Sequence, residues 1–332
     1  MAYCSANDSF TLLDSPEFFS TVLHTMGCLS IPVYVFGGYC ILAKTPGDMH
    51  TVKFSLFNFH IWSCFVDIVL SLLTTPYMLG PLFAGIPLGI LSLVGMDTAP
   101  QVYLVMAAEA AMGVAILGLF ENRYFILSND TGWWSRLRVP WYLVNYFVAF
   151  AYYYPAYSGI ADDQTDAKAY VHEWLPCLPA SVLNQSIFLV GTGSAITALS
   201  GPAEIVLIYV QGFAIVQLIT RVLAQYGHQM SKSTVHLQRK FIRSLKLQVA
   251  IPFFIFVLPI LYSTVSGYAY YHNQALNNFA YVVLSTHGFF STISLIVIHT
   301  PYRKFALQCI GLDTKDARKK NSVVSTSVTT TF

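Results

Sequence analysis

Seven long apolar stretches restrict the fold of this chain more than any other feature of its sequence. A helix needs roughly 20 mainly apolar residues to cross a bilayer, because the hydrocarbon is about 30 Å thick and each residue rises about 1.5 Å. Barrel strands alternate over about ten residues, and these stretches are longer and more uniformly apolar. They cover approximately residues 20–43, 54–79, 99–123, 139–160, 201–226, 247–270 and 278–300. We therefore expect an all-α membrane protein, a bundle of seven transmembrane helices.

The composition agrees with a protein whose solvent is partly lipid. Only 10% of the 332 residues are charged, while 55% are hydrophobic and 15% are aromatic. Soluble domains carry about 25% charged residues, so an ordinary soluble enzyme is excluded, as is a disordered or fibrous protein. The net charge of +2 is too small to predict nucleic-acid binding. We expect a lipid bilayer as a partner and no nucleic acid.

Two further segments bear on the number of spans. Residues 80–97 are also apolar, but their many Pro and Gly residues predict a re-entrant or surface-lying loop, with an eighth span as the alternative. Residues 1–19 contain no Lys or Arg, and the first apolar run is too long for a cleavable signal peptide. The first helix is therefore expected to act as its own insertion signal.

The basic residues are distributed very unevenly between the loops. Of the 18 Lys and Arg residues, all but Lys168 fall in alternate loops and in the C-terminal tail, which lie on one side of the bundle. Basic residues stay on the cytoplasmic side of short loops. This distribution predicts an extracellular N-terminus and a cytoplasmic C-terminus. The basic run from Lys232 to Lys246 either meets a cytoplasmic partner or simply follows this rule.

The third span ends in FENRY, which contains Glu121, Asn122, Arg123 and Tyr124. This segment resembles the Asp-Arg-Tyr signature of rhodopsin-like receptors, where carboxylates hold the arginine until a G protein docks. Here Asn122 separates the acid from the base, and residues two apart do not face each other on a helix. We therefore expect Arg123 to use another partner. The alternative is a basic residue that anchors the helix end at the lipid headgroups.

The seventh span ends in TPYRKF, which contains Pro301, Tyr302 and Arg303. Proline bends the chain there, and the apolar residues after it recur at helical spacing. We expect a membrane-surface helix over residues 301–311 and a disordered, Ser/Thr-rich cytoplasmic tail over 312–332. Cys309 is a candidate for palmitoylation, with an unmodified thiol as the alternative.

Four segments together give a more specific resemblance. They are SPEF at 15–18, KTP at 44–46, FENRYFIL at 120–127 and TPYRKF at 300–305. In this order and spacing the chain resembles the nematode serpentine receptors of class H, from about residue 15 to 310. The resemblance implies an olfactory-type, G-protein-coupled chemoreceptor in the plasma membrane of sensory neuron endings or cilia. It implies a heterotrimeric G protein and a small-molecule ligand as partners. From the spans and the loop charges we expect a short extracellular segment over 1–19 and a receptor domain over 20–300. The resemblance names no ligand, and a receptor dimer stays open.

Three acidic residues lie within or at the edge of apolar stretches: Asp67, Glu109 and Glu204. A charge at the bilayer centre costs about 2.5–3.5 kcal/mol, and Asp67 and Glu109 fall at similar depth near the midplane. Both cannot stay charged without a cation or hydrogen-bond donors. They predict either a polar activation centre or protonated carboxyls that only fix helix packing, and Glu109 is also a candidate ligand contact. Glu204 is expected to stabilise the N-terminus of the fifth helix.

The sixth span contains Pro252 and Pro259, each of which removes a backbone hydrogen bond. The resulting kink either supplies a lever for an outward swing of this helix or is an ordinary membrane-helix kink. A ligand pocket is expected in the outer half of the bundle, between spans three, five, six and seven. Its Tyr and Phe content would suit a small, partly apolar ligand.

The outer side carries candidates for covalent modification. Cys4 and Cys177 are the cysteines expected there, and an oxidising compartment permits a disulfide between them. Asn7 and Asn184 begin N-glycosylation sequons on the same side. Both modifications depend on the predicted orientation of the chain.

Enzyme motifs are lacking in the sequence. It contains no Gly-rich phosphate loop, no HExxH and no paired-cysteine metal spacing, so we expect no enzymatic activity, cofactor or metal. The seventh span has no lysine, which excludes a retinal Schiff base. The alternative function is a ligand-gated channel or transporter subunit. Seven-helix odorant channels of insects place the N-terminus inside, so the loop charges favour the receptor.

Overall fold

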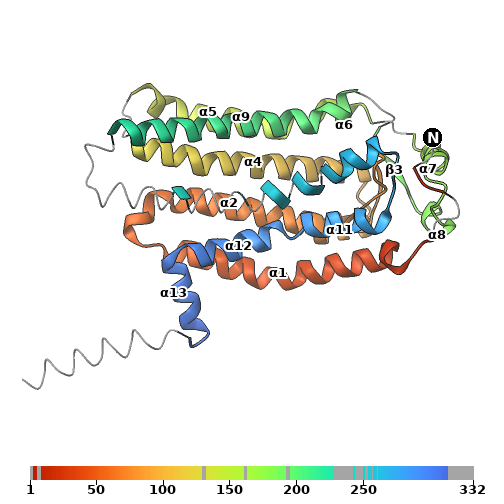
Figure 1. The fold of residues 1–332 in the computed structure, drawn as a ribbon, viewed down its shortest axis with the longest axis horizontal. Helices are drawn as coiled ribbons and strands as arrows, with labels where there is room; N and C mark the ends of the chain where they lie inside the picture. The colour runs from red at the N-terminus through yellow and green to blue at the C-terminus, as the bar shows by residue number, and fades with distance from the viewer. Residues whose placement is uncertain are drawn as a thin grey trace, which may run out of the picture.

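The computed structural model describes a bundle of long helices that run along one common axis (Figure 1). The described residues are 3–5, 9–128, 132–160, 163–191, 195–226, 242–243, 250, 253–255, 257–259 and 261–312. The long elements are α1 (Pro16–Lys44), α2 (His50–Ile68), the π-helical turn η3 (Val69–Leu73), α4 (Thr98–Ser128), α5 (Trp133–Ala151), α9 (Ala195–Tyr226), α11 (Gln274–Leu284) and α12 (His287–Ile298). The short helices are η1 (Leu12–Asp14), η2 (Gly47–Met49), α3 (Ile90–Leu93), α6 (Tyr154–Ser158), α7 (Ala167–Trp174), α8 (Ala180–Leu183) and α13 (Thr300–Cys309).

Five of these helical segments are long and apolar enough to cross a membrane. They are Pro16–Lys44, His50–Leu73, Thr98–Ser128, Gly201–Gln225 and Gln274–Ile298. The predicted sixth span corresponds to a shorter apolar helix, Phe253–Tyr268, which the structure describes in part. The predicted fourth span corresponds to α5, whose first two turns contain Arg136 and Arg138.

Two helices begin earlier than the sequence predicted. The fourth span was expected over 139–160, but α5 begins at Trp133 and places Pro140 inside the helix. The fifth span was expected to begin at residue 201, but α9 begins at Ala195. Glu204 is therefore more than two turns inside α9, and its predicted role at the helix N-terminus is wrong.

A small antiparallel sheet closes one end of the bundle. It has the order β1-β2-β3, formed by β1 (Pro76–Met78), β2 (Ala84–Pro87) and β3 (Phe188–Leu189). Tyr77 pairs with Ile86, and Gly85 pairs with Phe188. Residues 80–97 thus contain β2 and α3, and the predicted span 54–79 ends as a helix at Leu73.

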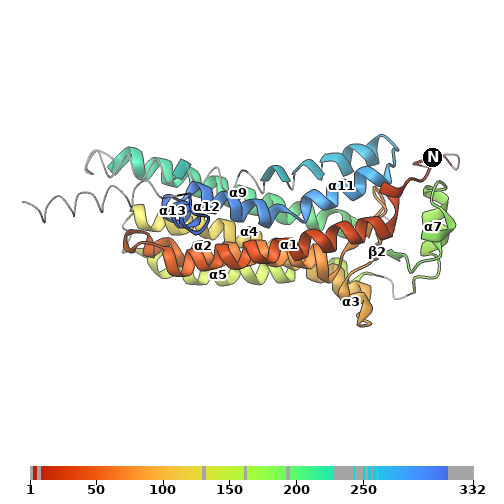
Figure 2. The ribbon, with the colours of Figure 1, turned by 90° about the horizontal axis from the view of Figure 1, so that it is seen from below.

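The two ends of the bundle are built differently (Figure 2). We call the end with the sheet, α7, α8 and the N-terminal segment the sheet end. The opposite end, which we call the α13 end, carries α13, a helix that lies across the direction of the bundle (Figure 1).

Helix α4 is the centre of the bundle and packs against α2, α5 and α9. Small residues allow this close packing. A Cβ atom on Gly118 would lie 3.0 Å from the Tyr142 side chain of α5, and one on Gly113 would overlap Ile208 of α9. Helices in a membrane associate through such close contacts, because lipid provides no hydrophobic driving force between them. Side chains on α4 can therefore interact directly with several neighbouring helices.

Candidate functional site

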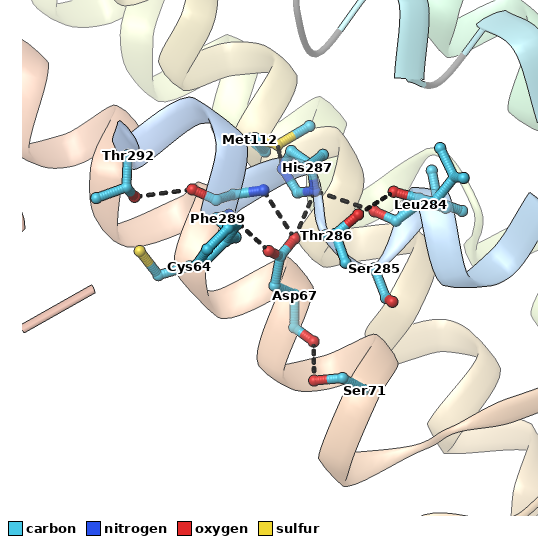
Figure 3. A network of polar contacts seen from close by, with 12 residues as sticks. Cys64, Asp67, Ser71, Met112, Leu284, Ser285, Thr286, His287, Phe289 and Thr292 are labelled. Carbon is cyan, nitrogen blue, oxygen red and sulfur yellow. Dashed lines mark hydrogen bonds and ion pairs between the residues drawn. The ribbon is translucent and has the colours of Figure 1, made fainter. Parts of the chain in front are cut away.

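A buried polar cluster is centred on Asp67, in the last turn of α2 (Figure 3). The Asp67 side chain is 1% exposed. Its carboxylate accepts a hydrogen bond from the Tyr34 hydroxyl of α1 at 2.6 Å and pairs with Nδ1 of His287 at 2.6 Å. The backbone N–H groups of Gly288 and Phe289 also donate to it, each at 3.0 Å. Asp67 therefore connects three helices, α1, α2 and α12.

An interruption in the predicted seventh span creates this arrangement. Helix α11 ends at Leu284 and α12 begins at His287, so Ser285 and Thr286 separate them. The first N–H groups of a helix have no partner within it, and the helix dipole favours a negative charge there. Asp67 satisfies two of these groups at the start of α12. Gly288 permits the close approach, since a Cβ atom there would lie 2.5 Å from the carbonyl oxygen of Ser63.

His287 is the central residue of the cluster and is fully buried. While Nδ1 faces Asp67, Nε2 lies 2.9 Å from the sulfur of Met112 on α4. A second histidine, His60 of α2, lies nearby, with Nε2 at 3.0 Å from the carbonyl oxygen of Tyr34. The cluster thus ties the central helix α4 to the other three helices.

Asp67 and Glu109, predicted as one polar centre, both lie near His287, but in different ways. Asp67 forms the ion pair, whereas Glu109 of α4 interacts with His287 only at longer electrostatic range. Among the described residues, no hydrogen bond or ion pair reaches the Glu109 carboxylate. His287 was not predicted from the sequence, although an ionisable residue inside an apolar span is itself a signal of function.

A second buried polar cluster surrounds Glu121 near the α13 end of α4. The Glu121 side chain has no exposed surface and pairs with Nη2 of Arg138 at 2.9 Å. Trp134 Nε1 donates to the same carboxylate at 3.0 Å, and the Tyr142 hydroxyl donates at 2.9 Å. All three partners come from α5. The acid of FENRY is therefore held by the neighbouring helix, through partners that were not predicted from the sequence.

The other residues of FENRY have separate environments. Asn122 donates from Nδ2 to the carbonyl oxygen of Thr51 at 2.9 Å and accepts from Arg138 at 3.2 Å. Arg123 is buried, with 8% of its surface exposed. The ring of Tyr124 packs edge-on against Trp134. FENRY thus joins α4 to the start of α2 and to α5.

The TPYRKF segment forms the joint between α12 and α13. Pro301 lies in the first turn of α13. The N–H groups of a first turn have no partner within the helix, so proline costs no helical hydrogen bond there. Tyr302 is fully buried, and its hydroxyl lies 2.7 Å from Oγ1 of Thr45 at the end of α1. Arg303 donates from Nη1 to the carbonyl oxygen of Val297 at 3.1 Å. Cys309 is exposed at the last position of α13.

At the sheet end, Cys4 and Cys177 form a disulfide with an S–S distance of 2.06 Å. It joins the N-terminal segment to the chain between α7 and α8. Asn184 is exposed at the end of α8 on the same end of the bundle. Asn7 lies outside the described residues, as does Pro252, while Pro259 lies in a short described helical stretch.

Tyr3 reinforces the attachment of the N-terminal segment. Its N–H donates to the carbonyl oxygen of Trp174 at 2.8 Å, and its own carbonyl oxygen accepts from the N–H of His272 at 3.0 Å. Its ring stacks on Tyr270 at 5.5 Å. Burial is the main cause that raises the pKa of Tyr3, and the phenols of Tyr270 and Tyr170 add to it. The segment therefore bridges α7 and the chain that leads into α11.

The chemistry available in these clusters is that of hydrogen bonds and ion pairs. Within the described ranges, no group of three or more His, Cys, Asp or Glu side chains is placed to hold a metal ion. The two buried clusters can therefore hold neighbouring helices in place through hydrogen bonds and ion pairs.

Both clusters lie within the part of the chain that is similar to known proteins. The sequence model of the serpentine seven-transmembrane chemoreceptor family Srh, a class of G-protein-coupled receptors, matches residues 14–312. The chain is also 26% identical over 306 residues to Serpentine receptor class H-72 of Caenorhabditis elegans. That alignment covers 88% of this chain and 86% of the relative. The family match extends from Asp14, the last residue of η1, through α13.

Proposed function

The chain belongs to the Srh family of serpentine seven-transmembrane chemoreceptors, and on this premise we propose that it couples a small-molecule ligand to a heterotrimeric G protein. The ligand binds in the half of the bundle nearer the sheet end, between α4, α9, α11 and the predicted sixth helix. The G protein binds at the α13 end. Binding shifts the population between two bundle conformations, because a ligand favours the state to which it binds more tightly.

The proposed orientation places the sheet end outside the cell. Lys44, Lys53 and Arg138 lie toward the α13 end, where the positive-inside rule places a cytoplasmic surface. The Cys4–Cys177 disulfide lies at the opposite end, and disulfides persist in oxidising, extracellular surroundings. In this orientation Asn184 is accessible to glycosylation, and Cys309 lies at the cytoplasmic leaflet, where palmitoylation occurs. We place the protein in the plasma membrane of sensory neuron endings.

The buried Glu121–Arg138 pair is the observation that carries this proposal. Glu121 has no exposed side-chain surface, whereas 22% of the Arg138 side chain is exposed. A protein that docks at the α13 end can therefore reach the cation but not the acid. Loss of Arg138 leaves Glu121 without its charged partner, which favours another packing of α4 against α5. FENRY, with Glu121 through Tyr124, is the proposed activation switch.

The α12–α13 joint completes the proposed G-protein surface. Pro301 and Arg303 begin α13, and Tyr302 holds the joint against Thr45 of α1. A movement of α12 would therefore be transmitted to α13. Since Asp67 holds the start of α12, the mid-membrane cluster lies between the proposed ligand region and this joint.

Second-messenger output in cells tests the proposed function. We would apply a panel of volatile and water-soluble chemicals and record cAMP, cGMP and calcium, with surface expression matched between variants. Arg123→Ala should abolish a response that the wild type gives, because it removes the buried basic residue of FENRY. Arg136→Ala is the matched control, since Arg136 is exposed on α5. An agonist current that persists with G proteins blocked would instead support a ligand-gated channel.

A further inference from the structure

Two acids on neighbouring helices, the buried Glu204 and the half-buried Glu109, have no direct partner among the described residues. Glu204 is 6% exposed and lies on the face of α9 that also carries Ile208, Ile215 and Ile219. Glu109 lies on α4 and interacts electrostatically with Tyr281 of α11. Within the described ranges, neither carboxylate forms a hydrogen bond or an ion pair. An unpaired carboxylate in a membrane interior is costly, so such residues are usually functional.

The packing of α4 against α9 places these two acids at the same level. A Cβ atom on Gly201 would lie 3.6 Å from Met106, and one on Gly113 would overlap Ile208. Glu109 and Glu204 each fall between these two contacts along their helices. Both acids also interact electrostatically with Tyr152, which follows α5. The Tyr152 hydroxyl donates to the carbonyl oxygen of Met106 at 3.2 Å, and this bond holds its ring beside α4.

The nearby imidazole of His287 already has an acid as its partner. His287 lies 2.6 Å from Asp67, whereas it acts on Glu109 only at longer range. The other titratable groups that interact with Glu109 are the phenols of Tyr281 and Tyr152, which bring no positive charge. Among the described residues, no cationic side chain forms an ion pair with Glu109 or Glu204.

We propose that the ligand is a small organic cation, an amine that is protonated at neutral pH and carries an apolar body. Its ammonium group binds between Glu109 and Glu204, where it supplies the positive charge that this part of the bundle lacks. The aromatic rings of Tyr152 and Tyr281 favour a cation against their faces. The apolar body contacts Met106 and Ile208. This inference rests on the proposed function and names the ligand class of the same receptor.

Thermal unfolding of the purified receptor in detergent tests the proposal without a G protein. The probes are 2-phenylethylamine and the straight-chain primary amines from butylamine to octylamine, each paired with the alcohol of the same skeleton. At least one amine should raise the Tm by about 3 °C, while its alcohol should not. Glu109→Gln and Glu204→Gln should each remove this shift. Glu173→Gln, which changes an exposed acid of α7, should retain it.

Several outcomes would overturn the amine site. They are equal stabilisation by the alcohols, shifts that persist in both Gln variants, or no shift with any amine. Glu109→Asp, which keeps the charge, should retain part of the shift, and the Tm without amine reports whether each variant folds. Amine binding without any second-messenger response would support the site and contradict the receptor function. Signalling by a neutral agonist that is equal in the wild type and in Glu109→Gln would support the receptor function and contradict the amine site.

Discussion

Nδ1 of His287 lies 2.6 Å from a carboxylate oxygen of Asp67, so the first residue of α12 is paired with the last turn of α2. Both side chains are buried, with 0% and 1% of their surfaces exposed. The pair holds the chain where α11 stops and α12 begins. Because α12 leads directly into α13, this contact connects the Asp67 cluster to the α13 end.

Removing one partner of this pair should strongly destabilise the bundle. Asp67→Ala or His287→Ala should each lower the free energy of unfolding by about 3–5 kcal/mol, because each leaves a buried polar group without its partner. The double variant should cost less than the sum of the two. Thermal unfolding in detergent measures this coupling, with Asp97→Asn, an exposed acid, as the control. Additive losses would show that the two residues act independently.

Gly288 should be sensitive to the addition of a single methyl group. A Cβ atom there would lie 2.5 Å from the carbonyl oxygen of Ser63 and 2.9 Å from Oδ2 of Asp67, so Gly288→Ala should cost about 3 kcal/mol. Gly212→Ala is the matched control in a helix, because the nearest atom, on Leu117, is 3.5 Å away. That change should be neutral or stabilising by up to about 1 kcal/mol. Equal Tm values for the two variants would contradict the packing around Gly288.

The Glu121–Arg138 pair should respond asymmetrically to mutation. Arg138→Ala leaves a fully buried carboxylate with only the neutral donors Trp134 and Tyr142, so it should cost about 3 kcal/mol. Glu121→Gln should cost about 1 kcal/mol, because Arg138 is partly exposed and the amide oxygen still accepts hydrogen bonds. Chemical or thermal unfolding measures both losses. Arg136→Ala, an exposed residue of the same helix, should change nothing.

The apolar stretches predicted the helical bundle because span length is fixed by bilayer thickness. The third span, expected over 99–123, is α4 from Thr98 to Ser128, which continues past the charged FENRY segment. The start of α5 was missed for a related reason. In the sequence, Arg138 and Pro140 are typical of a helix boundary. In the structure, the charge of Arg138 is tolerated inside α5 because it pairs with Glu121 of α4.

The polar clusters were predictable only in part. The charges of Asp67 and Glu121 within or beside apolar stretches identified these residues from the sequence alone. Their partners His287 and Arg138 are more than two hundred and 17 residues away, respectively, and only the packing of helices brings them together. The break between α11 and α12 consists of Ser285 and Thr286, and neither is a proline or glycine that would predict a break from the sequence. Asp67 satisfies two of the N–H groups that the break leaves free.

The disulfide should stabilise the sheet end without affecting the clusters. Cys4 and Cys177 are separated by 173 residues, and closing a long loop by a disulfide typically contributes about 2–4 kcal/mol. Cys4→Ser and Cys177→Ser should therefore lower the Tm equally, and a reductant should lower the wild-type Tm to the same value. Cys28→Ser, which changes an exposed free cysteine of α1, is the control. A further loss of Tm when Cys4→Ser is reduced would contradict this assignment.

Glu109→Gln should behave differently from every change to the paired acids. Glu109 has no hydrogen bond or ion pair among the described residues, so a neutral amide of nearly the same shape removes no direct contact and cannot carry a costly charge inside the bundle. Without ligand, its Tm should therefore equal or exceed that of the wild type. The gain in the free energy of unfolding should be at most about 1 kcal/mol. Asp67→Asn, which weakens the pair with His287, should melt lower in the same experiment. If Glu109→Gln melts as low as Asp67→Asn, then Glu109 has a structural partner in the bundle, and its carboxylate is not available to bind a ligand.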